Sequence, residues 1–130
     1  MAANPINNEA QFAQAAVQHW QNLGQELKAE VEQFNRNGGS ASFSQPSAHE
    51  YRVSNSDSGL AVVVVADPAD HIVRYEFART NRQSAGAPES GMLSMRMGKA
   101  GVEFYSSDQP VGADEARGLL LDPVLNPPAA

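Results

Sequence analysis

Apolar residues in the first third of the chain recur at steps of three and four positions, which is the period of an α-helix. The apolar stripe consists of Phe12, Ala16, Trp20, Leu23, Leu27, Val31 and Phe34. Asn8 is suited to cap the start of the helix, with Gln11 placed as in a capping box, and Asn37–Gly39 is suited to its end. The pattern predicts an amphipathic helix over residues 8–36.

After this helix the apolar period changes to two, which is typical of strands with one buried face. Four or five such segments are separated by short runs of turn-forming residues. The segments that alternate are Tyr51–Val53, His71–Ala78, Met92–Met97 and Val102–Tyr105. Leu60–Ala66 is instead a short β-branched run, which predicts a central strand that is apolar on both faces. Their connections are too short for parallel crossovers, so we expect antiparallel pairing in sequence order. A short helix is predicted from Gly112, with Pro123 at its end.

The apolar stripe of the helix and the apolar face of the sheet must both be buried away from water. They bury each other when the helix packs on the sheet. The sequence therefore predicts one α+β domain over residues 8–125, with flexible tails at 1–7 and 126–130. A long N-terminal helix packs on a four- or five-stranded antiparallel meander, followed by a short C-terminal helix. The expected core comprises Trp20, Leu23, Leu27, Val31, Val73, Tyr75, Phe77, Leu93, Met95 and Phe104. The residues expected on the open face are Arg52, Arg74, Glu76, Arg96 and Glu103.

The expected helix is longer than the sheet that it covers. Residues 8–36 would extend for about 43 Å, whereas a strand of seven residues extends for about 24 Å. Leu60–Ala66 is apolar at every position, so two of its four valines should face away from the helix. Because monomers rarely expose a large apolar patch, we expect either a second copy or the segment Gly112–Leu125 to cover them. A twofold homodimer is the preferred reading.

Composition excludes several classes of function. The chain has 130 residues and no cysteine, which excludes disulfide scaffolds, thiol catalysis and cysteine-based zinc sites. The longest strongly apolar run, Leu60–Ala66, is far shorter than the about 20 residues that span a membrane. The N-terminus lacks a signal-peptide pattern. We therefore expect a soluble, cytoplasmic protein without a membrane partner, unless a leader has been removed.

The chain is acidic, with a net charge of −6 and a pI of about 4.9. Nucleic-acid binding usually requires a basic surface, because neutralisation of phosphates dominates affinity. We therefore expect no nucleic-acid partner. An acidic surface favours solubility or a basic protein partner.

Few side chains suggest chemistry. The three histidines are not at metal-ligand spacing, and Asp67–His71 is more typical of a turn than of a site. No nucleotide-binding, metalloprotease, EF-hand or nucleophile-elbow motif is present in the sequence. We predict no catalytic residue, no metal and no cofactor. The sequence favours a binding protein over an enzyme, while leaving the second possibility open.

Two groups of residues are candidates for binding. Trp20 is the single tryptophan, and it either anchors the core or lines a pocket. Arg74, Arg79 and Arg82 flank a strand end, and arginines bind phosphates and carboxylates through paired donors. Arg74 alternates with Glu76, so it can instead pair across the sheet.

The sequence therefore predicts a non-enzymatic protein–protein interaction module, such as an adaptor, a chaperone or an immunity-type partner. The alternative is a small-molecule binder or minor enzyme with a pocket between helix and sheet, near Trp20, Tyr75 and Tyr105. A cavity of at least a few hundred Å³ with convergent polar groups would favour the alternative. A helix packed flush on the sheet would exclude it.

Overall fold

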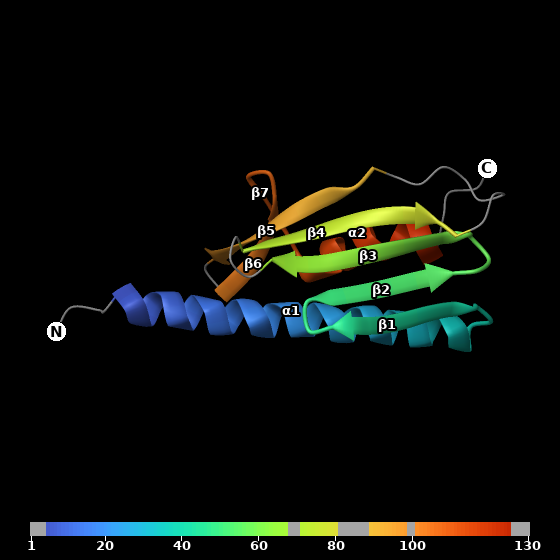
Figure 1. The fold of residues 1–130 in the computed structure, drawn as a ribbon, viewed down its shortest axis with the longest axis horizontal. Helices are drawn as coiled ribbons and strands as arrows, with labels where there is room; N and C mark the ends of the chain where they lie inside the picture. Colours follow the sequence, from blue (N-terminus) through green and yellow to red (C-terminus); the bar gives the residue numbers. More distant parts are fainter. Residues whose placement is uncertain (1–4, 68–70, 81–88, 99–100, 126–130) are drawn as a thin grey trace.

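The chain folds around one antiparallel sheet accompanied by two helices (Figure 1). The structure, a computed structural model, describes residues 5–67, 71–80, 89–98 and 101–125. The elements in chain order are α1 (Pro5–Arg36), β1 (Ala41–Ser47), β2 (Glu50–Asn55), β3 (Leu60–Asp67), β4 (Ile72–Arg79), β5 (Gly91–Gly98), β6 (Gly101–Ser106), β7 (Gln109–Val111) and α2 (Ala113–Leu125). Each strand pairs with the next one in sequence. The predicted α+β meander is confirmed, but it has seven strands rather than four or five.

The two strands that the sequence did not predict lie at the edges of the sheet. β1 pairs with β2 through contacts such as Phe43 opposite Val53, and its register shifts between Ser44 and Ser47, around Pro46. β7 has three residues, one of them a proline, and such a strand is too short to show alternation. Proline cannot donate a hydrogen bond to a neighbouring strand and is therefore tolerated at sheet edges. Both segments form strands because they pair with a neighbouring strand, and not because their own sequence alternates.

α1 begins at Pro5 rather than at the expected Asn8, and proline is well tolerated in a first helical turn. The helix ends as predicted: Gly38 has a left-handed φ of 97°, and the amide of Gly39 donates to the carbonyl of Phe34 at 3.0 Å. With 32 residues α1 extends for about 48 Å. Its N-terminal part continues past the end of the sheet (Figure 1), so the expected overhang is present.

The sheet has a buried inner face and an open outer face. Alternate residues of β3 are buried on the inner face, namely Leu60, Val62, Val64 and Ala66. Val65 lies on the outer face, where it is 38% exposed. Both helices cover the inner face: the Nδ2 atom of Asn55 donates to the carbonyl of Val124 in α2 at 2.9 Å. The C-terminal segment therefore packs beside α1 and does not cover the outer valines.

α2 continues through Pro123, which was expected to end it. Proline removes one hydrogen bond within a helix. The last turn is held by burial, because Val124 and Leu125 are both inside the core. The core is a single cluster shared by α1, the inner face and α2. The expected core residues belong to it, except that Tyr75 and Phe77 are only partly buried.

Gly24 lies in the middle of α1, where a glycine can permit a bend. The structure gives it a packing role instead. A Cβ atom at this position would overlap the ring of Tyr51, whose hydroxyl donates to the carbonyl of Trp20 at 3.0 Å. Without the glycine, the tyrosine ring and the helix could not approach this closely.

We predict that Gly24→Ala lowers the free energy of unfolding by up to about 2 kcal/mol. Alanine favours a helix by about 1 kcal/mol, but overpacking of a core costs about 1–3 kcal/mol. The matched control is Gly118→Ala in α2, where the nearest atom to a new Cβ is Oδ2 of Asp122 at 3.3 Å. That side chain is exposed and can move, so this variant should be neutral or stabilising. Urea unfolding compares the two, and equal effects would contradict the packing role of Gly24.

Candidate functional site

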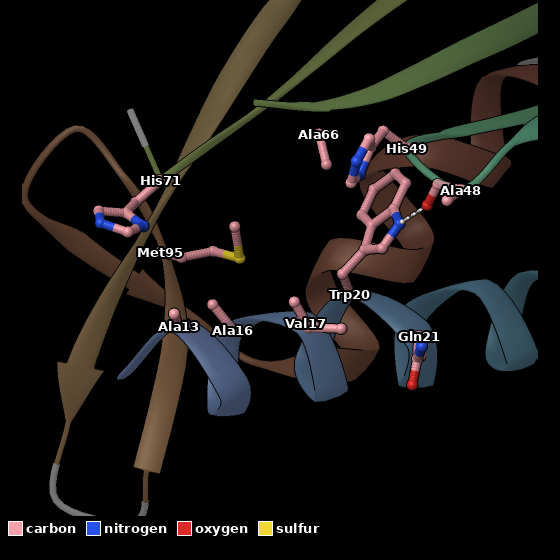
Figure 2. A pocket seen from close by; sticks show the side chains of 10 residues that line it. All are labelled: Ala13, Ala16, Val17, Trp20, Gln21, Ala48, His49, Ala66, His71 and Met95. Atoms are coloured by element: carbon pink, nitrogen blue, oxygen red, sulfur yellow. Dashed lines mark hydrogen bonds between the residues drawn. The ribbon is translucent and has the colours of Figure 1, made fainter. Parts of the chain in front are cut away.

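A cavity of about 150 Å³ opens where the N-terminal half of α1 passes the end of the sheet. We call it the α1 cavity (Figure 2). It is bounded by α1, by the β1–β2 turn, by the end of β3, by the middle of β5, and by His71 just before β4. Its lining residues are Ala13, Ala16, Val17, Trp20, Gln21, Ala48, His49, Ala66, His71 and Met95.

The helix side of the α1 cavity follows from the spacing of its residues. Ala13, Ala16, Val17 and Trp20 recur at steps of three and four, so they share one side of α1. Figure 2 shows these side chains pointing into the cavity. Val17 is 48% exposed although it is apolar. The helix therefore presents an apolar surface that the sheet does not cover.

Trp20 is held in a fixed orientation at one end of the α1 cavity. Its indole Nε1 donates to the carbonyl of Ala48 at 2.9 Å. Its ring stacks on Tyr51, with ring centres 4.1 Å apart and planes 18° from parallel. A buried tryptophan whose N–H has a partner contributes apolar area without a desolvation penalty. The indole is thus a rigid wall that needs no rearrangement to receive a ligand.

Two histidines stand at the rim, and the backbone around each is fixed. The carbonyl of His49 accepts from the amide of Ala66, and that of His71 accepts from the amide of Met95, both at 2.8 Å. His71 has a left-handed φ of 54°, and its ring meets that of Phe12 edge-on at 4.5 Å. His71 thus supplies a wall of the cavity, while residues 68–70 of the turn expected at Asp67–His71 fall outside the described residues.

The α1 cavity can bind an apolar group but offers little to a reaction. Most of its lining is apolar side chain, and its polar groups are those of Gln21 and the two rim histidines. In the part of the chain that the structure describes, no three His, Asp or Glu side chains lie close enough to hold a metal ion. Small-molecule sites usually measure about 300–1,000 Å³, and this cavity is smaller. A dry cavity of about 150 Å³ holds a molecule of the size of benzene.

His19, on another side of α1, lies outside the α1 cavity. Its ring packs on Phe104 with centres 4.3 Å apart, and its Nε2 atom is buried without a hydrogen-bond partner among the described residues. Burial lowers the pKa of His19 below its usual 6.5, while the charges of Glu26 and Glu103 oppose that shift. The neutral imidazole therefore suits the folded state better than the charged one.

We predict that the protein loses stability as the pH falls from about 7 to 5, in part because of His19. The pKa of His19 is lower in the folded state, so the unfolded chain binds its proton first. His19 therefore stabilises the fold fully only above the unfolded pKa near 6.5. The slope of unfolding free energy against pH should flatten in His19→Gln. The matched control, His49→Gln at an exposed histidine, should keep the wild-type slope, and equal flattening would contradict this role.

The binding candidates from the sequence are dispersed in the structure. Trp20 lines the α1 cavity, but Tyr75 and Tyr105, expected beside it, do not. Arg74 and Arg79 are five positions apart on β4 and therefore lie on opposite faces of the sheet. Arg74 forms an ion pair with Asp67 at 3.9 Å. Arg82 falls outside the described residues, so the arginine site stays a prediction.

The methionines also divide between environments. Met95 is buried in the core and reaches the α1 cavity, as Figure 2 shows. Met92 lies on the outer face and is 56% exposed. Met97 alternates in step with Leu93 and Met95 but is exposed at the end of β5. A residue that alternates correctly within a strand can still be exposed when it lies at the end of that strand.

Sequence reasoning missed most of the lining of the α1 cavity. Ala13, Ala48 and Ala66 are small side chains, and they form a cavity because they leave space unfilled. Their identity carries no functional signal by itself. The usable signal was the expected overhang of the helix beyond the sheet, combined with small residues on its apolar side.

Comparisons with known proteins identify no relative. No protein-family model matches the chain, no curated protein is significantly similar to it, and no solved structure matches it. Among the described residues, no helix is both long enough and apolar enough to cross a membrane. Evidence for function therefore comes from the geometry of this chain alone.

Proposed function

We propose that this chain is a non-enzymatic protein-binding module whose α1 cavity receives one apolar side chain of a partner. The observation that carries the proposal is a rigid apolar cavity beside an exposed apolar stretch of helix. Protein interfaces commonly concentrate their affinity in a few apolar anchors that fill such pockets. A role as an adaptor, a chaperone or an immunity-type partner is consistent with this arrangement.

The size of the α1 cavity favours a side chain over a free metabolite. A volume of about 150 Å³ matches a benzene-sized group and is below the usual range for small-molecule sites. A partner protein adds contacts outside the cavity, on the apolar surface around Val17.

The partner is expected to be apolar at its anchor and basic elsewhere. The chain carries a net charge of −6, and complementary charge accelerates association more than it tightens the complex. Cytoplasmic location and self-association, which the sequence also suggested, stay predictions.

The test compares capture of partner proteins by wild type and by a variant whose cavity is filled. Ala66→Leu places a larger side chain at a strand position that lines the α1 cavity. Ala61→Leu makes the same change on the same strand but on the outer face, and is the matched control. We expect a stoichiometric partner with wild type and with Ala61→Leu, and its loss with Ala66→Leu. Thermal unfolding shows that each variant is folded.

A second pair of variants tests the surface beside the cavity. Val17→Asp places a charge on the exposed lining of the α1 cavity, whereas Gln25→Asp makes an exposed change on α1 outside the lining. We predict a loss of partner binding of about tenfold or more for Val17→Asp and little change for Gln25→Asp. The proposal would be contradicted if Ala66→Leu and Val17→Asp bound the partner as tightly as wild type does. Repeated capture of no stoichiometric protein by wild type would also contradict it.

A small apolar ligand is the second candidate for the same cavity. Trp20 forms one wall, so its fluorescence should report occupancy. Titration with toluene should give a saturable change in wild type and none in Ala66→Leu. Saturation at micromolar toluene, together with no protein partner, would favour the small-molecule function over the protein-binding one.

A further inference from the structure

The outer face of the sheet carries a regular arrangement of charge around two valines. In one row across three strands, Val63 lies between Arg52 on β2 and Glu76 on β4. In the next row on this face, Val65 lies between Glu50 and Arg74. We call these six residues the outer patch. Residues directly opposite in antiparallel strands project to the same side, so all six side chains share this face.

The signs of the outer patch alternate in both directions. On the β2 side the charges are positive at Arg52 and negative at Glu50, and on the β4 side they are negative at Glu76 and positive at Arg74. The four charges therefore form a checkerboard whose centre is apolar. Two copies of this face can pack against each other about a twofold axis that lies in the plane between the two sheets. In that arrangement each charge of one copy meets an opposite charge of the other.

We propose that the outer patch is a self-association surface that binds a second copy of this chain through a twofold axis. If the axis runs along β3, Arg52 faces Glu76 of the second copy, and Glu50 faces its Arg74. If the axis runs across β3, Arg52 faces Glu50 of the second copy, and Glu76 faces its Arg74. The valines of the two copies meet at the centre in both arrangements.

The monomer leaves this surface incompletely satisfied. Arg52 pairs with Glu50 on its own strand, and Arg74 lies 3.9 Å from Asp67. Among the described residues, Glu76 makes no salt bridge. Val65 is 38% exposed, and Met92, opposite Arg74, is 56% exposed. A second copy would cover these apolar side chains and give Glu76 a cationic partner.

The size of the surface predicts a weak dimer. Strands lie about 4.8 Å apart and rise about 3.4 Å per residue, so β2 to β5 present a surface about 14 Å wide and about 27 Å long. Two such faces cover about 760 Å² in total, which is below the about 1,000 Å² of a stable specific interface and fits a weak, transient one. Aligned packing of two sheets, about 10 Å apart, is a common way to cover such a face. We expect a dissociation constant in the micromolar range.

The surface is separate from the α1 cavity. The outer patch lies on the face of the sheet that the helices leave open, whereas the cavity is built between α1 and the inner side. Self-association therefore does not depend on the proposed partner binding, and each can fail alone. Variants in the outer patch should leave toluene binding in the α1 cavity unchanged.

The first experiment is sedimentation equilibrium of the full chain over about 10 to 500 μM, where small interfaces associate. Wild type should move from 13.9 kDa toward twice that mass. Glu76→Arg should weaken the dimer about tenfold or more, because like charges then face each other across either axis. This substitution also makes the net charge less negative, which by itself would favour association. Wild type that stays monomeric, or Glu76→Arg that dimerises like wild type, overturns the proposal.

The matched control is Glu32→Arg, which changes the net charge equally at an exposed position on α1. It should dimerise like wild type. Equal weakening by Glu32→Arg would assign the effect to net charge rather than to the outer patch, and would overturn the proposal. Circular dichroism confirms that each variant is folded.

Mixtures of two variants then test the complementarity itself. An axis along β3 predicts that Glu76→Arg and Arg52→Glu each self-associate more weakly than wild type but form a tighter heterodimer when mixed, because all facing charges become opposite. An axis across β3 predicts the same rescue for Glu76→Arg mixed with Arg74→Glu. Rescue in one mixture supports the proposal and fixes its axis. Rescue in neither mixture overturns it.

Discussion

Leu27→Ala should lower the free energy of unfolding by about 2–5 kcal/mol, as truncation of fully buried leucines does. Leu27 has no exposed surface and lies near the middle of the apolar stripe of α1. It belongs to the core cluster to which both helices and the inner face contribute. The surroundings of a truncated core leucine relax only partially, so the substitution should leave a cavity.

The matched control is Leu119→Ala in α2, where the side chain is 39% exposed. It makes the same chemical change and should cost no more than about 1 kcal/mol, since surface substitutions have small effects. Urea unfolding followed by the fluorescence of Trp20 measures both variants. A loss below about 0.5 kcal/mol for Leu27→Ala would mean that a different side of α1 faces the sheet.

The parts of the fold that the sequence predicted are those in which one element carries its own periodic signal. The stripe of α1 repeats often enough to identify both the helix and its buried side. β2 and β4 are as clear, because β-branched and aromatic residues alternate with polar ones, and β3 is identified by its short β-branched run. Turn-forming residues between them excluded parallel crossovers, so the meander order followed from chain connectivity.

The parts that the sequence did not predict are those that depend on neighbours. β1 is rich in serine and contains Pro46, so its pattern does not indicate a strand, and only pairing with β2 makes it one. The position of α2 was equally hidden. Its leucines do not form a single clean stripe, and nothing local decides which face of the sheet they cover. As a result, the sequence allowed the C-terminal segment to cover the outer valines, whereas in the structure α2 packs on the inner face.

The candidate site shows the same division. Trp20 and the overhang of the helix were predictable from composition and length. The cavity itself required the three-dimensional structure, because it arises where alanines from α1, the β1–β2 turn and β3 meet. Space left unfilled by small side chains gives no recognisable pattern in a single sequence. The outer patch is intermediate. Three of its four charges, Arg52, Arg74 and Glu76, were expected on the open face, but the checkerboard depends on the register of three strands.

Asn55→Ala should lower the free energy of unfolding by about 2–3 kcal/mol, because it removes two hydrogen bonds and leaves a buried carbonyl without a partner. Asn55 is 2% exposed. Its Nδ2 donates to the carbonyl of Val124 at 2.9 Å, and its Oδ1 accepts from the amide of Asp57 at 3.1 Å. The last carbonyls of a helix have no partner within the helix. This side chain therefore joins the end of α2 to the sheet.

Asn55→Asp separates the hydrogen bond to α2 from the bond to the turn. The carboxylate keeps an acceptor for the amide of Asp57 but turns a second acceptor toward the carbonyl of Val124, and it buries a charge. Burial should raise the pKa of the new carboxyl group, so this variant should be least stable at neutral pH. As the pH falls, the protonated acid can again donate to Val124, and stability should recover toward that of wild type. The matched control, Asn22→Asp at an exposed position on α1, should show no such recovery. If Asn55→Asp and Asn22→Asp respond alike to pH, the buried bond does not hold α2 in place.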